Sequence, residues 1–138
     1  MSETLGHRHL VSVIVNWVLK KHSSTPGFCS YCDNPTVLQT EKPPPIDGFY
    51  ADVHAVTTPQ AVTLRGEAKT LPDLDSERSF NQIVAFLRFL SVRPEPTLIM
   101  ATPWQARASA KNIVRLARRQ AVAPDVPVLY LTDLDKPC

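Results

Sequence analysis

Two apolar runs near the C-terminal end, separated by a strongly basic segment, constrain the fold of this chain most. The runs are PTLIMAT (96–102) and VPVLYLT (126–132), each short and continuous enough to be a buried strand. The segment between them, 104–120, has apolar residues at helical spacing. A strand, a helix and a second strand in this order indicate a parallel crossover, in which helices cover the faces of the sheet.

The first two thirds of the chain add further elements of both kinds. Residues 5–21 carry an apolar stripe at helical spacing, although their β-branched content leaves a strand open for part of the segment. Residues 23–35 are rich in turn formers and predict a loop. The remaining predicted elements are a short strand at 36–41, a hairpin with strands at 49–56 and 61–69, and a helix at 76–91 capped by Asp75 or Ser76.

The predicted order is therefore helix, three strands, helix, strand, helix, strand. Three antiparallel strands that lead into crossovers predict an α/β fold with one central mixed β-sheet flanked by helices, in the order αβββαβαβ. A chain of 138 residues, 43% of them hydrophobic, is long enough for one core and too short for two comfortable domains. We therefore expect a single domain over residues 1–138.

Composition and cysteine content bear on the cellular setting. The apolar stretch LVSVIVNWVL is only ten residues long and contains Asn16, too short and too polar to span a bilayer. The following KKHSSTPG is a poor signal-peptide cleavage site. Three unevenly spaced cysteines argue against a disulfide framework and fit a reducing compartment. The expectation is a cytoplasmic protein that does not enter a membrane.

Charged residues stand within the predicted hairpin, where core residues are expected. Glu67 and Lys69 are two residues apart on one strand and so share a face. The turn TTPQ has an even number of residues, and a bulge-free hairpin closed there pairs Asp52 with Arg65. Asp52 then lies on the same face, with Glu67 as its diagonal neighbour. The pattern predicts a cluster of two carboxylates and one amine.

Such a cluster is suited to binding a divalent cation. Two close carboxylates repel each other and raise each other's pKa unless a cation lies between them. Mg²⁺, or Mn²⁺ in its place, binds few protein carboxylates and keeps several waters. An ion held in this way activates a water and orients a scissile phosphate. Lys69 would position the water or the phosphate, because proton abstraction would require a lowered pKa that the nearby carboxylates oppose.

The amino-acid sequence of the predicted hairpin resembles that of a known enzyme family. ADV (51–53), a turn and then LRGEAKT (64–70) resemble the core of the PD-(D/E)xK nuclease superfamily, which has the restriction-endonuclease-like fold. Ala51 stands where the family usually has proline. The family's α-β-β-β-α-β core matches the predicted order, and the motif-level resemblance covers residues 46–91.

The resemblance implies a particular set of site residues. Many members carry a glutamine on the helix after the lysine, and RSFNQIVAFL offers Gln82 in that place. Asp52 and Glu67 would then be the metal ligands, and the catalytic set would be Asp52, Glu67, Lys69 and Gln82. Some members add a glutamate from the first helix, and the acid nearest to that position is Glu3.

Two alternatives remain open for these residues. Asp47, in PPPIDG, is a rival for the first acid, although a proline-rich stretch followed by glycine is also the setting of a turn aspartate. The charges at 65, 67 and 69 would also fit the solvated outer face of an edge hairpin, as ordinary cross-strand charges.

The segment 104–120 contains no acidic residue and carries a basic stripe. Basic residues that recur every four positions on a helix share a face. Such a stripe fits phosphate contacts along a nucleic-acid backbone and, alternatively, an ordinary solvated helix surface. The candidate nucleic-acid-binding residues are Arg107, Lys111, Arg115, Arg118 and Arg119.

Cys29 and Cys32, in CSYC, have the spacing of half a zinc site. No second motif completes it, so a structural Zn²⁺ would need scattered ligands such as His22, His54 or Cys138, or a second chain. The alternative is a pair of free thiols on a loop.

These observations favour a Mg²⁺-dependent nuclease that hydrolyses DNA, acting as an endonuclease. A homodimer would let two sites cut both strands, and a larger nuclease assembly is the other arrangement considered. The alternative function is a non-catalytic nucleic-acid-binding or assembly subunit that retains the fold. The sequence leaves the choice between DNA and RNA open.

Overall fold

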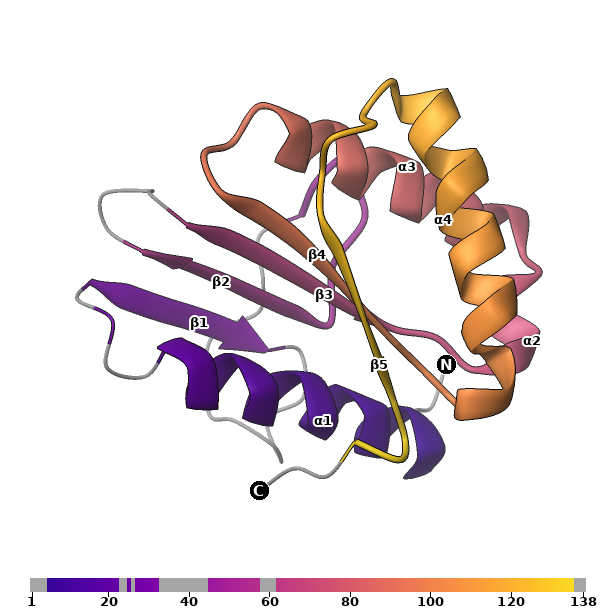
Figure 1. Cartoon of the computed structure of the whole chain (residues 1–138), viewed down its shortest axis with the longest axis horizontal. Coiled ribbons are helices and arrows are strands. Elements are labelled where there is room, and N and C mark those ends of the chain that lie inside the picture. Colours follow the sequence, from indigo (N-terminus) through magenta and orange to yellow (C-terminus); the bar gives the residue numbers. More distant parts are fainter. Residues whose placement is uncertain (1–4, 23–24, 26, 33–44, 58–61, 136–138) are drawn as a thin grey trace.

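The structure is a computed structural model that describes residues 5–22, 25, 27–32, 45–57 and 62–135 (Figure 1). Three strands follow the first helix, and helical segments and strands alternate from there on. Their bounds are α1 (Leu5–His22), β1 (Phe28–Cys32), β2 (Val53–Thr57), β3 (Thr63–Ala68), α2 (Leu71–Leu74), α3 (Glu77–Ser91), β4 (Pro96–Thr102), the 3-10 helix η1 (Trp104–Ala106), α4 (Arg107–Ala121) and β5 (Val128–Thr132).

The strands of the described residues form one five-stranded sheet in the order β1-β2-β3-β4-β5. β1, β2 and β3 pair antiparallel, whereas β3, β4 and β5 pair parallel. The predicted α/β class, with a central mixed sheet flanked by helices, is confirmed. β3 is the middle strand and the one at which the sheet changes from antiparallel to parallel pairing.

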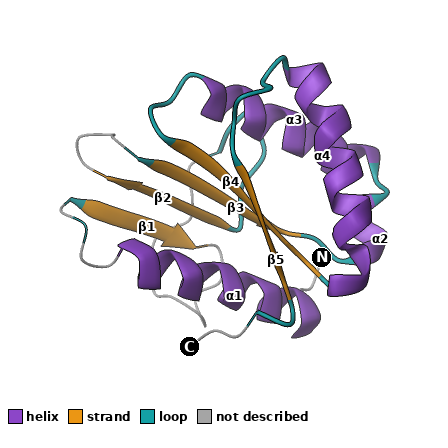
Figure 2. Cartoon of the chain, in the orientation of Figure 1, coloured by secondary structure: helices purple, strands orange, loops and turns teal. Residues whose placement is uncertain are grey.

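Helices cover both faces of the sheet (Figure 2). α1 packs on one face, where Ile14 and Val18 meet Leu64 and Ile99. α3 and α4 pack on the other face and against each other, around Phe86, Leu98 and Met100. No helix in the described part of the chain is long and apolar enough to cross a membrane. The result is a three-layer arrangement with the sheet in the middle.

The first strand lies in a different place from the one predicted. β1 spans 28–32, inside the segment 23–35 that was predicted as a loop, so that prediction is wrong for these residues. Gly27, with φ +72°, supplies the turn immediately before the strand. Within the described residues β1 pairs only with β2, and this tertiary pairing forms a strand where the surrounding turn formers predicted a loop. The predicted strand at 36–41 lies outside the described residues.

The register of the β2–β3 hairpin also differs from the prediction. Arg65 pairs with His54, not with Asp52, which is a shift of two residues. The reason is that the backbone N–H of Thr57 donates to the carbonyl of Val62 (3.1 Å), so the connection starts one residue later than TTPQ. A shift by an even number of residues leaves each side chain on its predicted face.

Gly66 in the GEAKT stretch has a packing role. A Cβ at this position would lie 2.7 Å from Cγ2 of Ile14 and 3.3 Å from Cβ of Val53. The close approach of β3 to α1 therefore requires the absence of a side chain. It brings the start of α1 towards the end of the sheet where Glu67 and Lys69 lie.

The ends of the later helices are set by local signals. Ser76 is the N-cap of α3, since its Oγ accepts from the backbone N–H of Ser79 (3.0 Å). The α-helix predicted from 104 begins instead at Arg107, because the first three residues form η1. This short turn joins β4 to α4 (Figure 1).

Candidate active site

The charged face of β3 is buried. Every residue of β3 is buried, with Arg65 0% and Glu67 4% exposed. β2 and β4 pair with both edges of β3, and Phe86 of α3 lies over the Arg65 guanidinium. The alternative of a solvated edge hairpin is therefore wrong, because the strand is central and a helix covers its polar face. Charges in such a position require specific partners.

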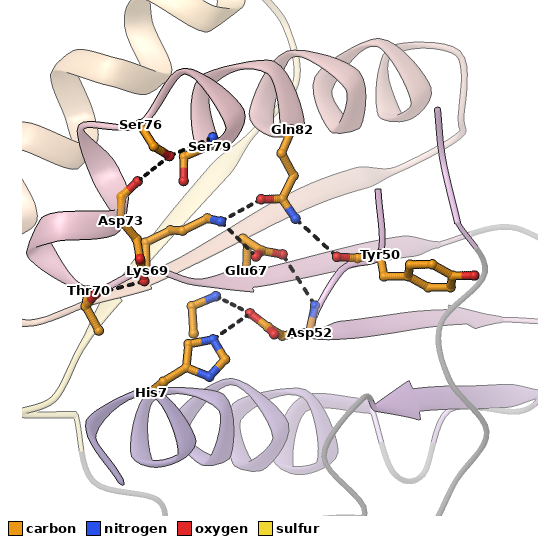
Figure 3. A network of polar contacts seen from close by, with 11 residues as sticks. His7, Tyr50, Asp52, Glu67, Lys69, Thr70, Asp73, Ser76, Ser79 and Gln82 are labelled. Carbon is orange, nitrogen blue, oxygen red and sulfur yellow. Dashed lines mark hydrogen bonds and ion pairs between the residues drawn. The ribbon is translucent and has the colours of Figure 1, made fainter. Parts of the chain in front are cut away.

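The two predicted carboxylates meet at the end of the sheet (Figure 3). Asp52 lies one residue before β2, and Glu67 lies near the carboxyl end of β3. The backbone N–H of Asp52 donates to Oε2 of Glu67 (3.3 Å), and the N–H of Ala68 donates to Oδ2 of Asp52 (2.8 Å). These contacts fix both carboxylates against the same pair of strands.

Lys69 and Gln82 join the same network (Figure 3). Nζ of Lys69 lies 3.3 Å from Oε1 of Glu67 and donates to Oε1 of Gln82 (2.5 Å). Nε2 of Gln82 donates in turn to the carbonyl of Tyr50 (3.1 Å), so the amide has a defined orientation. The four residues of the predicted catalytic set thus converge from β3, the residue directly after it, α3 and the segment before β2.

The protonation of Glu67 reflects this environment. Burial raises the pKa of Glu67 well above its ordinary value, and the negative charge of Asp52 raises it further. The ammonium of Lys69 opposes the shift by favouring the charged form. A positive charge placed between the two carboxylates would lower the pKa of Glu67 again by favouring its charged form. The site is therefore suited to attracting a cation.

His7, in the first turn of α1, is a site residue that the sequence did not reveal. Its Nε2 lies 3.4 Å from Oδ2 of Asp52, and both side chains are mostly buried. No spacing links residue 7 to residue 52, since the contact depends on how α1 packs against the end of the sheet. Glu3, the acid considered for this helix, lies outside the described residues.

The donor set fits a hard divalent cation with few protein ligands. Within the described ranges, no three His, Cys, Asp or Glu side chains gather as a metal-binding group. Two carboxylates, Asp52 and Glu67, are what Mg²⁺ uses where waters and substrate phosphates complete its octahedron. The buried, raised-pKa carboxylate beside a second acid is the observation that supports this fit.

Asp47, the rival for the first acid, lies elsewhere. Ile46 and Phe49 exchange two backbone hydrogen bonds of 2.9 Å, which closes a two-residue turn over Asp47 and Gly48. Both turn residues have positive φ, +51° and +80°. The side chain of Asp47 is exposed on this turn, so the turn-aspartate interpretation fits the geometry.

Arg65 is a second buried charge on β3, two residues before Glu67. Nη1 of Arg65 lies 3.1 Å from Nδ1 of His54, and its guanidinium stacks 4.5 Å from the Phe86 ring centroid. Burial lowers the pKa of Arg65 to about 10. Burial, and then the positive charge of Arg65, lowers the pKa of His54 to about 4. Neutral His54 can therefore accept the hydrogen bond through Nδ1.

Cys29 and Cys32 do not form a joint site. They lie three residues apart on β1, so their side chains project from opposite faces of the strand, Cys29 exposed and Cys32 buried. A zinc ion requires both thiolates within about 2.3 Å. As described, the pair cannot bind the same ion.

The basic residues of α4 point mostly to solvent. Arg107, Lys111, Arg115 and Arg119 are exposed at four-residue spacing, while Ala110, Val114 and Ala117 face the core. Arg118 differs, since its Nη1 donates to the carbonyl of Pro124 (2.8 Å) just beyond the helix. The other four form a continuous basic face that begins next to the end of β4.

Comparisons of the chain with protein-family models, with curated proteins and with solved structures found no match.

Proposed function

We propose that this protein is a metal-dependent nuclease of the PD-(D/E)xK type that hydrolyses DNA phosphodiester bonds. The observation that carries the proposal is the convergence of Asp52, Glu67 and Lys69 in one hydrogen-bonded cluster at the end of a central strand. A buried carboxylate with a raised pKa costs stability, which is typical of a functional site.

The roles of the residues follow from their contacts. Asp52 and Glu67 would hold Mg²⁺ or Mn²⁺, and the bound ion would supply positive charge to the scissile phosphate and make a water more acidic. Lys69 donates from a charged ammonium, so it positions the attacking water or a phosphate oxygen. Gln82 holds that ammonium in place, and His7 orients the carboxylate of Asp52.

The substrate is proposed to run from this cluster along α4. The exposed basic face of α4 starts beside the carboxyl ends of the parallel strands, where ligands of open α/β sheets generally bind. Basic side chains that neutralise phosphates bind the backbone without recognising its sequence. This arrangement supports a nuclease that selects the structure of its substrate.

The test is cleavage of a DNA panel that contains a single strand, a blunt duplex, a flap and a four-way junction. We expect cleavage that requires Mg²⁺ or Mn²⁺ and falls by about 100-fold or more in Lys69→Ala and in Asp52→Asn. Asp47→Asn is the matched control, because Asp47 is an exposed turn residue, and it should retain activity.

Two outcomes would contradict the proposal. Cleavage that survives in Lys69→Ala and Asp52→Asn would place the chemistry elsewhere. Folded protein that binds the panel but cuts none of it, with either metal, would favour the alternative of a non-catalytic nucleic-acid-binding or assembly subunit.

A further inference from the structure

Exposed apolar residues follow the carboxyl ends of the parallel strands, at the end of the sheet where Glu67 and Lys69 lie. Leu71 comes after β3, Trp104 after β4 and Leu134 after β5, and they are 51%, 54% and 67% exposed. The carboxyl ends of parallel strands lie on one edge, with neighbouring strands about 4.8 Å apart. We call these three residues the apolar row. Exposed large apolar residues that follow neighbouring strand ends at one end of a sheet are candidates for a binding surface.

Trp104 is held firmly within this row. Its backbone N–H donates to Oδ1 of Asp133 (2.9 Å), in the turn after β5. Two residues later, Ala106 is fully buried against Leu74 and Ala110. The backbone under the indole is therefore fixed from both sides, while half of the residue's surface remains open to solvent. An exposed indole on a fixed backbone is suited to stacking on a flat aromatic group.

The surroundings of Trp104 define the chemistry of its partner. The backbone N–H of Lys69 donates to the carbonyl of Ala101 (2.9 Å), only three residues before Trp104. On its other side, Arg107 and Lys111 begin the basic face of α4. An aromatic group between the proposed phosphate-positioning lysine and further cations matches a ligand in which flat bases alternate with phosphates.

We propose that Trp104 stacks on an unpaired base of the substrate, so that the protein acts on single-stranded DNA or on single-stranded segments of a larger DNA. This role deepens the proposed nuclease function and rests on it. A base inside a duplex is already stacked on both faces, and it can reach Trp104 only after it leaves the helix. The stacking position therefore discriminates against fully paired DNA.

Binding without divalent metal tests the proposal independently of cleavage. In EDTA, the affinity of the protein for a labelled strand of twelve thymidines is compared with that for a blunt twelve-base-pair duplex by fluorescence anisotropy. We expect the single strand to bind more tightly. Trp104→Leu, which keeps an apolar side chain, should weaken single-strand binding about fivefold or more, because stacking on one base is lost. Trp104→Phe should retain most of it.

Tryptophan emission gives a second readout. The chain has two tryptophans, and the other, Trp17, packs against the core on α1. In Trp17→Phe, saturating single strand should quench the remaining emission, whereas the duplex should leave it nearly unchanged. Val92→Ala, which changes an exposed apolar residue at the opposite end of the parallel strands, is the matched control and should bind as the parent protein does.

Several results would overturn the proposal. These are unchanged single-strand affinity in a folded Trp104→Leu protein, equal losses in Trp104→Phe and Trp104→Leu, or emission that the strand does not alter. A dimer in sedimentation that Trp104→Leu dissociates would assign the apolar row to a second copy of the chain. Metal-dependent cleavage insensitive to Trp104 would defeat this inference alone, and Trp104-dependent binding without cleavage would defeat only the proposed hydrolysis.

Discussion

Glu67 combines a position that costs stability with contacts that hold it in place. It is nearly inaccessible to solvent, and Asp52 adds negative charge beside it. The raised pKa means that the folded protein binds a proton more readily than the unfolded chain does, so ionisation of Glu67 at higher pH lowers the free energy of unfolding. A cation between the carboxylates would restore that stability.

The change in Tm on adding a divalent cation should show whether Glu67 binds the metal. A divalent cation that binds only the folded protein, at 100 times its dissociation constant, stabilises it by about 2.7 kcal/mol. We therefore expect Mg²⁺ or Mn²⁺ to raise Tm by several degrees in the parent protein. In the isosteric variant Glu67→Gln the shift should disappear, as differential scanning fluorimetry would show. A shift of full size in Glu67→Gln would remove this residue from the metal site.

His54 offers a prediction about pH. Its folded pKa of about 4 lies below the ordinary value of 6.5, so between these values the unfolded chain binds a proton that the folded protein does not. The free energy of unfolding should therefore fall as pH drops through this window, by up to about 3 kcal/mol. Denaturation in urea at pH 7, 5.5 and 4.5 measures the loss.

His54→Gln is the comparison that isolates this effect. Glutamine keeps an acceptor for Arg65 and does not titrate, so the fall between pH 6.5 and 4 should become shallower. The same pH dependence in both proteins would mean that other groups, such as carboxylates, account for the loss.

At the scale of elements, α4 ends in a conformation that its residue disfavours. Val122 is the C-cap, with φ +54° and ψ +49°, and its side chain is 82% exposed. A β-branched residue in the left-handed region is strained, whereas glycine adopts it freely. Val122→Gly should raise the free energy of unfolding by about 1 kcal/mol in chemical denaturation.

α3 provides the control for that substitution. Val92 is also a C-cap and is 79% exposed, but its φ is −104°, which suits an ordinary residue. Val92→Gly should therefore leave stability unchanged or lower it. Equal effects at the two positions would show that backbone conformation is not the cause.

The basic face of α4 makes a prediction about salt. If Arg107, Lys111 and Arg115 each contact a phosphate, replacing all three by glutamine should reduce the slope of log K against log salt by about 2 for a single strand. Lys20→Gln, at the far end of α1, should leave the slope unchanged. A slope that the triple variant retains would place the nucleic acid on another face.

At the scale of the whole molecule, the sequence predicted well the order of the helices and strands and the face on which each side chain lies. It predicted less well where each strand begins and how the strands are aligned. The mixed sheet, the flanking helices and the shared face of Glu67 and Lys69 follow from periodicity, which a two-residue register shift does not disturb. β1 was missed because its five residues, FCSYC, lie within a segment of turn formers, and pairing with β2 decides their conformation.

The parts of the site that escaped prediction all depend on tertiary packing. The contact of His7 with Asp52 requires α1 to meet the end of the sheet, and no local pattern encodes that. The burial of Arg65 depends on α3 lying over β3, whereas its alternating neighbours fit an exposed strand equally well. The local sequence shows which side chains of a strand share a face. It does not show which of the two faces a helix will cover.

The central place of β3 has a consequence for how the proposed nuclease would discriminate between substrates. Because β2 and β4 pair with both edges of this strand, Glu67 can move away only if the sheet itself opens. The polar cluster therefore loses its conformational entropy when the protein folds, before any ligand binds. If the protein is the proposed nuclease, a site preorganised in this way adapts little to a poor substrate, and selectivity would depend on how easily each DNA can be deformed to fit.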